Sequence, residues 1–225
     1  MIDKNQTVNK NDQAELTYQI MDASPGAYEK AAQAIRDGKI VVMPTLTIYV
    51  LVCDAFNSSA LRRLREIRHS PADKPITIVM DKSKIPEYAV IDERQQQIID
   101  IFSPSPVSMY VQKKEKTPLD AATASSDAIV VYFQDSPIRD LYECCGTILA
   151  ISSSNTKALL AAKTIEESIA YFGEDVDLYI DGGPAKGDNA SPHIDIRTKP
   201  VESRREATHF PFEKIKAMLT EHGLE

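Results

Sequence analysis

The sequence is poor in the residues that cross-link small secreted proteins or build structural metal sites. Its 225 residues include three cysteines, Cys53, Cys144 and Cys145, of which two are adjacent. Neighbouring cysteines rarely bridge to each other, and no CxxC or His–Cys spacing typical of zinc sites is present. An odd number of thiols without a pairing pattern is typical of a reducing compartment. We therefore expect buried or inert thiols and a cytoplasmic location.

Long apolar runs are also missing. The longest, residues 40–52, has only 13 residues and is interrupted by Pro44, Thr45 and Thr47. Such a run is too short and too broken to span a bilayer, so no membrane association is expected. The first residues lack the basic-then-apolar order of a signal peptide. Residues 1–22 are therefore predicted to form a polar, mobile N-terminal tail.

An excess of positive charge is missing as well. Lysine and arginine total 26 against 33 acidic residues, which gives a formal net charge of −7. The overall charge therefore provides no attraction to phosphates, and general nucleic-acid binding is disfavoured. The sequence contains no HExxH, GxSxG, EF-hand or paired-carboxylate pattern. Nothing indicates a hydrolase or a metal site built from protein side chains alone.

What remains is an ordinary globular composition, with 43% hydrophobic and 26% charged residues. A chain of this length buries roughly 70% of its unfolded surface, so it needs no cross-link. Short apolar runs alternate with amphipathic segments in no strict order, which predicts an α/β fold with a single open, twisted mixed sheet and flanking helices. Strands are expected at 40–43, 48–52, 76–80, 108–111, 128–133, 147–151 and 176–180, and helical composition extends over 156–172.

Two groups of side chains could bind a small ligand. Thr45 and Thr47 lie between two apolar strands, where hydroxyls are well placed to hold a small polar molecule. Arg68 and Lys74 lie in a proline-bracketed loop after a predicted helix, where cations could clamp phosphates. Each group also has a structural explanation. Threonine favours strands, and Arg68 suits the C-terminal end of the dipole of its own helix.

A third group, Ser153 and Asn155, follows a predicted strand and precedes a helical segment. Hydroxyls, an amide and free helix N–H groups converge in such a place, which is a geometry that binds anions. A simple helix N-cap explains the same residues. The glycine-rich segment 181–187 matches neither GxGxxG nor the Walker pattern, and we interpret it as a tight turn.

Taken together, the order and spacing of these motifs resemble one family. PTxT after a strand, then IRxxPxxKP, SxN and DGG…S…ID, is similar to the YrdC-like proteins, the L-threonylcarbamoyladenylate synthases and their relatives. The resemblance covers about residues 25–208 and implies a domain at 23–208 with a large concave cavity, followed by a C-terminal helix or tail at 209–225. Family enzymes combine ATP, bicarbonate and L-threonine into threonylcarbamoyl-AMP and pyrophosphate, for modification of adenosine in tRNA.

The resemblance also implies ligands and site residues. It indicates ATP with Mg²⁺ as cofactor, L-threonine and bicarbonate as further small molecules, and partners in tRNA modification. By position in the motifs, Thr45 and Thr47 correspond to amino-acid-binding residues. Residues that would bind the nucleotide and its phosphates are Arg68, Lys74, Ser153, Asn155, Ser191 and Arg205. No catalytic side chain is assigned.

The positions that depart from the family pattern include Leu46, Val50, Val52, Ser70 and Tyr132. Ser70 and Tyr132 each stand where the synthases carry an arginine. Losing two charged contacts of about 1.5–3 kcal/mol each corresponds to roughly two to four decades of activity. The altered clamp resembles the YciO-like branch more than the synthases. Two alternatives therefore remain: a diverged binder of an adenylate or modified nucleotide, and a double-stranded RNA-binding protein that uses the concave face.

Overall fold

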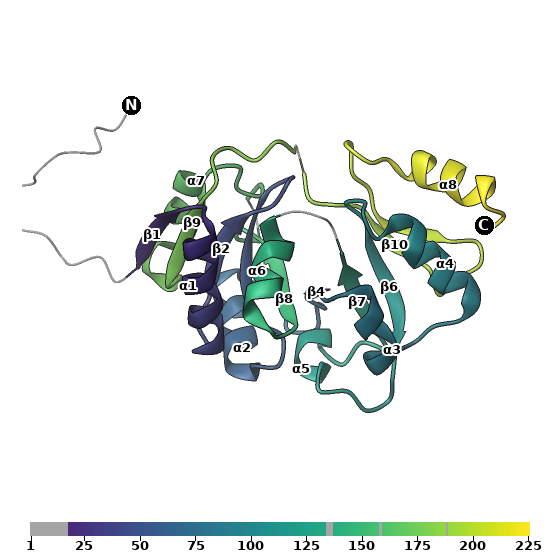
Figure 1. Cartoon of the computed structure of the whole chain (residues 1–225), viewed down its shortest axis with the longest axis horizontal. Coiled ribbons are helices and arrows are strands. Elements are labelled where there is room, and N and C mark those ends of the chain that lie inside the picture. The colour runs from purple at the N-terminus through teal and green to yellow at the C-terminus, as the bar shows by residue number, and fades with distance from the viewer. Residues whose placement is uncertain (1–17, 134–136, 158, 188) are drawn as a thin grey trace, which may run out of the picture.

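The computed structural model describes residues 18–133, 137–157, 159–187 and 189–225 (Figure 1). The strands are β1 (Gln19–Asp22), β2 (Val41–Pro44), β3 (Tyr49–Asp54), β4 (Thr77–Val79), β5 (Ala89–Val90), β6 (Ser108–Lys113), β7 (Ala128–Tyr132), β8 (Leu149–Ser153), β9 (Leu178–Asp181), β10 (His193–Asp195) and β11 (Glu202–Arg205). The helices are α1 (Pro25–Arg36), α2 (Ser58–Ile67), α3 (Ile85–Tyr88), α4 (Glu93–Phe102), α5 (Asp120–Thr123), α6 (Pro137–Cys145), α7 (Ile165–Phe172) and α8 (Phe212–Glu221), with 3₁₀ turns η1 (Lys82–Lys84) and η2 (Gly173–Asp175).

The strands of the described residues form one mixed sheet, which confirms the predicted fold class. Their order is β1-β9-β2-β3-β8-β4-β7-β6-β10-β11, and β5 pairs with β6 at the side. The neighbours β2 and β3 are antiparallel, as are β3 and β8, whereas β4 runs parallel to β7 and β6 parallel to β10. The sheet stays open because β1 and β11 are its two edges, at opposite ends of the molecule (Figure 1).

Helices cover the two faces of the sheet unequally. On one face, α1 and α6 pack against each other and against β2, and α1 also contacts β3 (Figure 1). The apolar side chains of α2, α4, α7 and α8 belong to the core on the other face. The face that carries α1 and α6 is therefore left open beyond the ends of these two helices, over the strands from β3 to β10.

Strands β2 and β3 have nearly continuous apolar sequences because both of their faces are covered. Every residue from Val41 to Pro44 is buried, and so is every residue from Tyr49 to Cys53. A continuous apolar run, rather than an alternating one, is the pattern that such burial requires. The turn between β2 and β3 brings Thr45 and Thr47 to the open part of the sheet.

Two sequence-based boundaries are wrong. Residues 19–22 belong to the sheet and not to a tail, because β1 pairs in parallel with β9 over four residues; residues 1–17 lie outside the described part. The helix expected over 156–172 begins only at Ile165, with Thr164 as its N-cap. Before it, the backbone of Ala162 bonds to Tyr49 and Ser154, so this segment lies against β3 instead of forming helical turns.

The C-terminal segment expected as a helix or tail is a helix packed on the domain. In α8, Ile215 and Leu219 are buried in the core beneath the β10 end of the sheet. Within the described residues, no helix is both long and apolar enough to cross a membrane.

Candidate functional site: a cationic cavity on the open face of the sheet

A cavity lies on the open face of the sheet, where the strands from β3 to β11 present their side chains. Its empty volume is about 610 Å³, including the part that opens to solvent. Among the described residues, no carboxylate lines it. The lining residues are Thr45, Thr47, Ile48, Val50, Arg68, Lys74, Pro75, Thr77, Ser108, Tyr132, Ile151, Ser152, Ser153, Ala190, Ser191, His193 and Arg205.

The structure brings the predicted residues together, since seven of the eight line this cavity and Asn155 lies directly behind the wall. They come from four separate stretches of the chain, so their meeting is a property of the fold. The cavity therefore gathers cations and hydroxyls in a protein whose overall charge is −7.

Thr45 and Thr47 close the turn between β2 and β3. The Thr45 hydroxyl donates to the Ile48 carbonyl at 2.8 Å and accepts from the backbone N–H groups of Thr47 and Ile48. Its hydrogen-bonding capacity is used within the turn. The Thr47 hydroxyl, by contrast, has a single hydrogen-bond partner among the described residues, the Thr45 hydroxyl at 3.3 Å, so Thr47 is the threonine with capacity left for a ligand.

Arg68 is held in place by the end of α2. The N–H groups of His69 and Ser70 bond to the carbonyls of Glu66 and Arg65, and His69 adopts a left-handed φ of 51°. This is a Schellman ending, in which the left-handed residue stops the helix. The chain therefore turns sharply after Arg68, and the side chain of Arg68 points back to the strand end of β8.

Four of the five N–H groups of Arg68 are bonded to protein acceptors. Nε donates to the carbonyls of Ser153 and Asn155, and Nη2 donates to the Ser153 hydroxyl and the Asn155 Oδ1, all between 2.9 and 3.1 Å. Nη1 donates to Ser70 Oγ at 3.0 Å. Arg68, which was predicted to bind phosphate, thus connects the end of α2 to the loop after β8 through its hydrogen bonds.

Ser153 and Asn155 are engaged in the same network. The Ser153 hydroxyl donates to Asn155 Oδ1 at 2.6 Å, and Asn155 Nδ2 donates to the carbonyls of Thr156 and Leu159. All polar atoms of the Asn155 side chain therefore have protein partners. Ser153 reaches the cavity, whereas Asn155 shapes the loop that presents Ser153.

Lys74 and Arg205 are the cations best placed to receive an anion. Lys74 is exposed on one side, and its ammonium group has no hydrogen-bond or ion-pair partner in the described part of the chain. Burial and the charges of Arg68 and Arg205 lower the pKa of Lys74. Arg205 donates through Nε and Nη2 to the Ser191 carbonyl, and burial lowers its pKa to about 10. An anion would relieve this mutual repulsion.

Ser191 and Tyr132 meet above the sheet. The Tyr132 hydroxyl shares a hydrogen bond with the Ser191 side chain, and burial raises the pKa of Tyr132. Both residues are buried, at 3% and 7% exposure. At this position the cavity wall is a neutral phenol in place of the arginine of the synthase pattern.

The other four departures, Leu46, Val50, Val52 and Ser70, lie in different surroundings. Val50 lines the cavity, whereas Val52 is fully buried in the core beneath α1. Leu46 does not line the cavity and is 46% exposed. Ser70 contacts Arg68, as described above, and thus keeps a polar contact at the altered clamp.

Sequence reasoning assigned no role to four polar residues of the cavity, Thr77, Ser108, Ser152 and His193. Ser108 is the first residue of β6, and His193 is the first of β10. The Nε2 atom of His193 is buried without a hydrogen-bond partner among the described residues. Burial together with the charges of Arg205 and Lys74 lowers the pKa of His193 well below its ordinary value. No sequence signal marks Ser108, since only the strand register brings it into the site.

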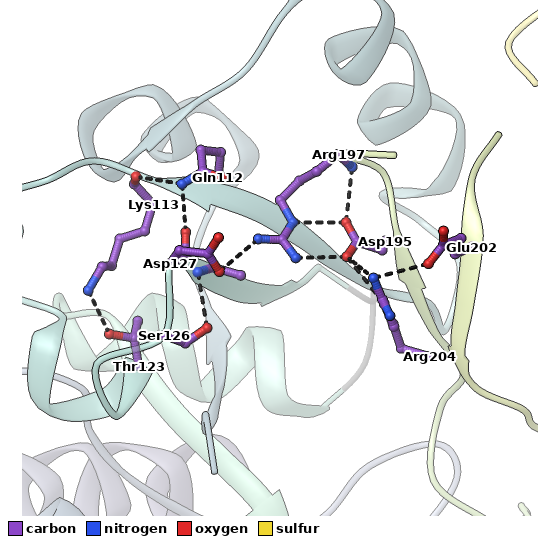
Figure 2. A network of polar contacts seen from close by, with 10 residues as sticks. Gln112, Lys113, Thr123, Ser126, Asp127, Asp195, Arg197, Glu202 and Arg204 are labelled. Carbon is purple, nitrogen blue, oxygen red and sulfur yellow. Dashed lines mark hydrogen bonds and ion pairs between the residues drawn. The ribbon is translucent and has the colours of Figure 1, made fainter. Parts of the chain in front are cut away.

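The edge that carries His193 and Arg205 is braced by a charged network (Figure 2). Asp195, which is fully buried, accepts from Arg197 Nη2 at 2.8 Å and from Arg204 Nη2 at 3.0 Å. Arg197 also pairs with Asp127, and Arg204 with Glu202. Burial alone would raise the pKa of Asp195, but the hydrogen bonds from the two arginines hold it below its ordinary value. The network joins β10 to β11 and to the start of β7.

Among the described residues, no group of three or more histidine, cysteine, aspartate or glutamate side chains is close enough to hold a metal ion. A divalent cation at this cavity would therefore depend on oxygen ligands brought by another molecule.

Comparisons with known proteins agree with this architecture. A threonylcarbamoyl-AMP synthase of Pseudomonas fluorescens is 29% identical over 173 residues, covering 76% of this chain and 92% of its own. The structure of Pyrococcus abyssi Sua5 with L-threonine superposes with a TM-score of 0.76 at 25% identity, over 86% of this chain and 58% of that one. This chain thus spans about three fifths of that Sua5 chain.

Escherichia coli YciO has the same fold, with a TM-score of 0.74 at 22% identity over 87% of this chain and 97% of its own. The values for Sua5 and YciO are nearly equal, so a closer relation to the YciO-like branch stays a prediction. The relatives support the synthase interpretation and offer no support for the two alternatives. The family model Sua5_yciO_yrdC, described as "Telomere recombination", matches residues 33–207. The chain belongs to this Sua5/YciO/YrdC family.

Proposed function

We propose that this protein forms an adenylate from ATP, bicarbonate and L-threonine, releasing pyrophosphate. The observation that carries the proposal is the cavity itself, where Arg68, Lys74 and Arg205 converge without a carboxylate among the described lining residues. Such a site favours a polyanion. The neighbouring positive charges repel one another, which lowers the pKa of a neighbouring cation such as Lys74, and a bound anion relieves this repulsion. The names of the relatives, and the L-threonine in the Sua5 structure, point to the same substrates.

In this proposal Lys74 and Arg205 contact the phosphates directly. Lys74 has three ammonium protons to donate, and Arg205 retains its Nη1 group beyond the bonds to Ser191. Arg68 acts mainly by presenting the Ser153 hydroxyl and by its charge. Mg²⁺ would be bound by the phosphate oxygens of ATP and by water, a common arrangement for this ion.

The chemistry consists of two steps. The threonine amine attacks the carbon of bicarbonate, a C–N bond forms, and water leaves to give a carbamate. A carbamate oxygen then attacks the α-phosphorus of ATP, and the bond from that phosphorus to the bridging oxygen breaks as pyrophosphate leaves. The protein contributes positioning and stabilisation of the negative charge that spreads over the phosphates. Neither step requires a covalent bond to a side chain.

We further propose that the product is used in tRNA modification and that the protein is cytoplasmic. The three cysteines are free thiols, and burial raises the pKa of both Cys53 and Cys145 to about 12. Thiols of this kind are unreactive and need no oxidising compartment.

Mass spectrometry of the reaction mixture tests the proposal. Purified protein is incubated with ATP, Mg²⁺, L-threonine and bicarbonate, beside an authentic synthase and the Lys74→Met variant. The expected result is threonylcarbamoyl-AMP that depends on threonine and falls at least tenfold in Lys74→Met. Absence of product beside a productive synthase refutes the proposed reaction. If ATP still binds in that case, the diverged-binder alternative becomes the better account.

A further inference from the structure

A row of cavity side chains runs across the sheet and ends at Arg205, and its three other members have no role in the proposed function. Tyr132 lies opposite Ser108 in the antiparallel pair of β7 and β6, and Ser108 lies opposite His193 in the parallel pair of β6 and β10. His193 in turn lies opposite Arg205 in β11. Residues that face each other across strands project to the same side of a sheet, and all four line the cavity.

The row deepens from one end to the other. Arg205 and the nearby Lys74 are exposed at the rim, whereas Ser108 and Tyr132 are only 2% and 3% exposed. With strands about 4.8 Å apart, Tyr132, Ser108 and His193 span roughly 10 Å. That length suits a small molecule better than a nucleotide triphosphate. The cations at the rim suit the phosphates of a nucleotide. The phosphates would therefore bind at the rim and the small molecule at the deep end of the cavity.

The deep part of the row carries no formal charge at neutral pH. The pKa of His193 is lowered and that of Tyr132 is raised, so both are neutral. A neutral imidazole offers one donor and one acceptor, and the hydroxyl of Ser108 offers both. The Nε2 atom of His193 is buried and has no partner among the residues that the structure describes. A buried polar atom without a partner is costly, so a ligand that supplies the partner gains affinity.

We propose that Tyr132, Ser108 and His193 form a floor that selects the acceptor substrate by an uncharged hydrogen-bonding group, with His193 as the main specificity-determining residue. This inference rests on the proposed function, because it assigns the deep end of the cavity to the amino acid. It predicts that a substrate with a side-chain hydroxyl is preferred over one of the same shape without it. A charged side chain finds no counter-ion at the floor and is disfavoured.

Calorimetric titration with L-threonine and L-valine tests the inference, since valine replaces the hydroxyl by a methyl group. The full chain is first saturated with a non-hydrolysable ATP analogue and Mg²⁺. The wild type is expected to bind threonine about 10- to 100-fold more tightly than valine, the range of one buried hydrogen bond. His193→Phe keeps an aromatic ring beside Tyr110, 5.9 Å away between centroids, and should reduce the ratio to within about threefold.

Three further variants separate a role in specificity from a role in folding. His193→Gln retains a donor and an acceptor and should recover most of the preference, whereas His222→Phe, at the exposed residue that caps the C-terminus of α8, should leave it unchanged. Ser108→Ala should lower the ratio even if His193→Phe fails to fold. In every folded variant, affinity for the ATP analogue should stay within about threefold of wild type.

A threonine preference that survives both His193→Phe and Ser108→Ala overturns the inference and leaves the proposed function intact. If the wild type binds the ATP analogue but neither amino acid, the assignment of the floor fails together with the threonine substrate.

Discussion

The two cations of the proline-bracketed loop should respond in opposite ways to removal. Arg68 and Lys74 are six residues apart and both line the cavity. Arg68 donates through Nε, Nη1 and Nη2 to protein acceptors, whereas the Lys74 ammonium group lacks such partners in the described part of the structure. Replacing each by methionine removes the charge and keeps an unbranched side chain of similar length.

The structure sets the size of each effect. Arg68→Met leaves the carbonyls of Ser153 and Asn155 and the Asn155 Oδ1 without their charged donor, which should lower the free energy of unfolding by about 3–5 kcal/mol. Lys74→Met breaks no bond in the protein and should change it by less than about 0.5 kcal/mol. The same substitution removes one charged contact to phosphate, worth about 1.5–3 kcal/mol, and should weaken ATP binding about 10- to 150-fold.

Urea unfolding followed by circular dichroism gives the stabilities, and calorimetric titration with ATP and Mg²⁺ gives the affinities. Lys82→Met, which removes an exposed lysine paired with Asp100, is a matched control that should keep nucleotide affinity. The reasoning is refuted if Lys74→Met destabilises the protein as much as Arg68→Met. It is also refuted if Lys74→Met binds ATP as the wild type does.

Three further predictions concern the framework of the site. His69→Gly should raise the free energy of unfolding by up to about 1 kcal/mol in urea, because glycine adopts the left-handed conformation without strain; a loss of stability would contradict the Schellman ending. Asp195→Asn should lower it by about 3–5 kcal/mol by leaving Arg197 and Arg204 without their buried anion, and a loss below about 1 kcal/mol would count against the network of Figure 2. Because the pKa of His193 is lower in the folded state than in the unfolded one, the unfolded chain binds the additional proton, and stability should fall as pH drops below about 6.5 by up to about 1.4 kcal/mol per unit. His193→Phe should remove that part of the slope, and equal slopes in both proteins would show that His193 does not titrate in this way.

The strands β2 and β3 were predictable because their apolar sequences directly indicate that they are buried. Residues 41–44 and 49–53 are continuously apolar and continuously buried. Strand β11, Glu202–Arg205, was missed because its residues are polar and mostly exposed at an edge. The helix expected from 156 was wrong because the local composition could not reveal that Ala162 bonds to the backbone of β3.

The candidate site was predictable in its members more than in their roles. The motifs indicated the hydroxyls and cations that now share one cavity. Whether a cation is free or bonded depends on side chains from distant segments, as the contact of Arg68 with Ser153 illustrates. The position of Ser108 beside His193 follows from the pairing of β6 with β10, a contact between residues far apart in the sequence.

A crystal structure of the protein with a non-hydrolysable ATP analogue, Mg²⁺ and L-threonine tests the central claim most directly. The account predicts phosphate oxygens within about 3.2 Å of Lys74 Nζ and the Arg205 guanidinium. It also predicts the amino acid at the deep end, beside Ser108 and His193. Phosphates bound elsewhere, for example in the cavity between Lys82 and Glu143, with Lys74 left without an anion, would contradict it.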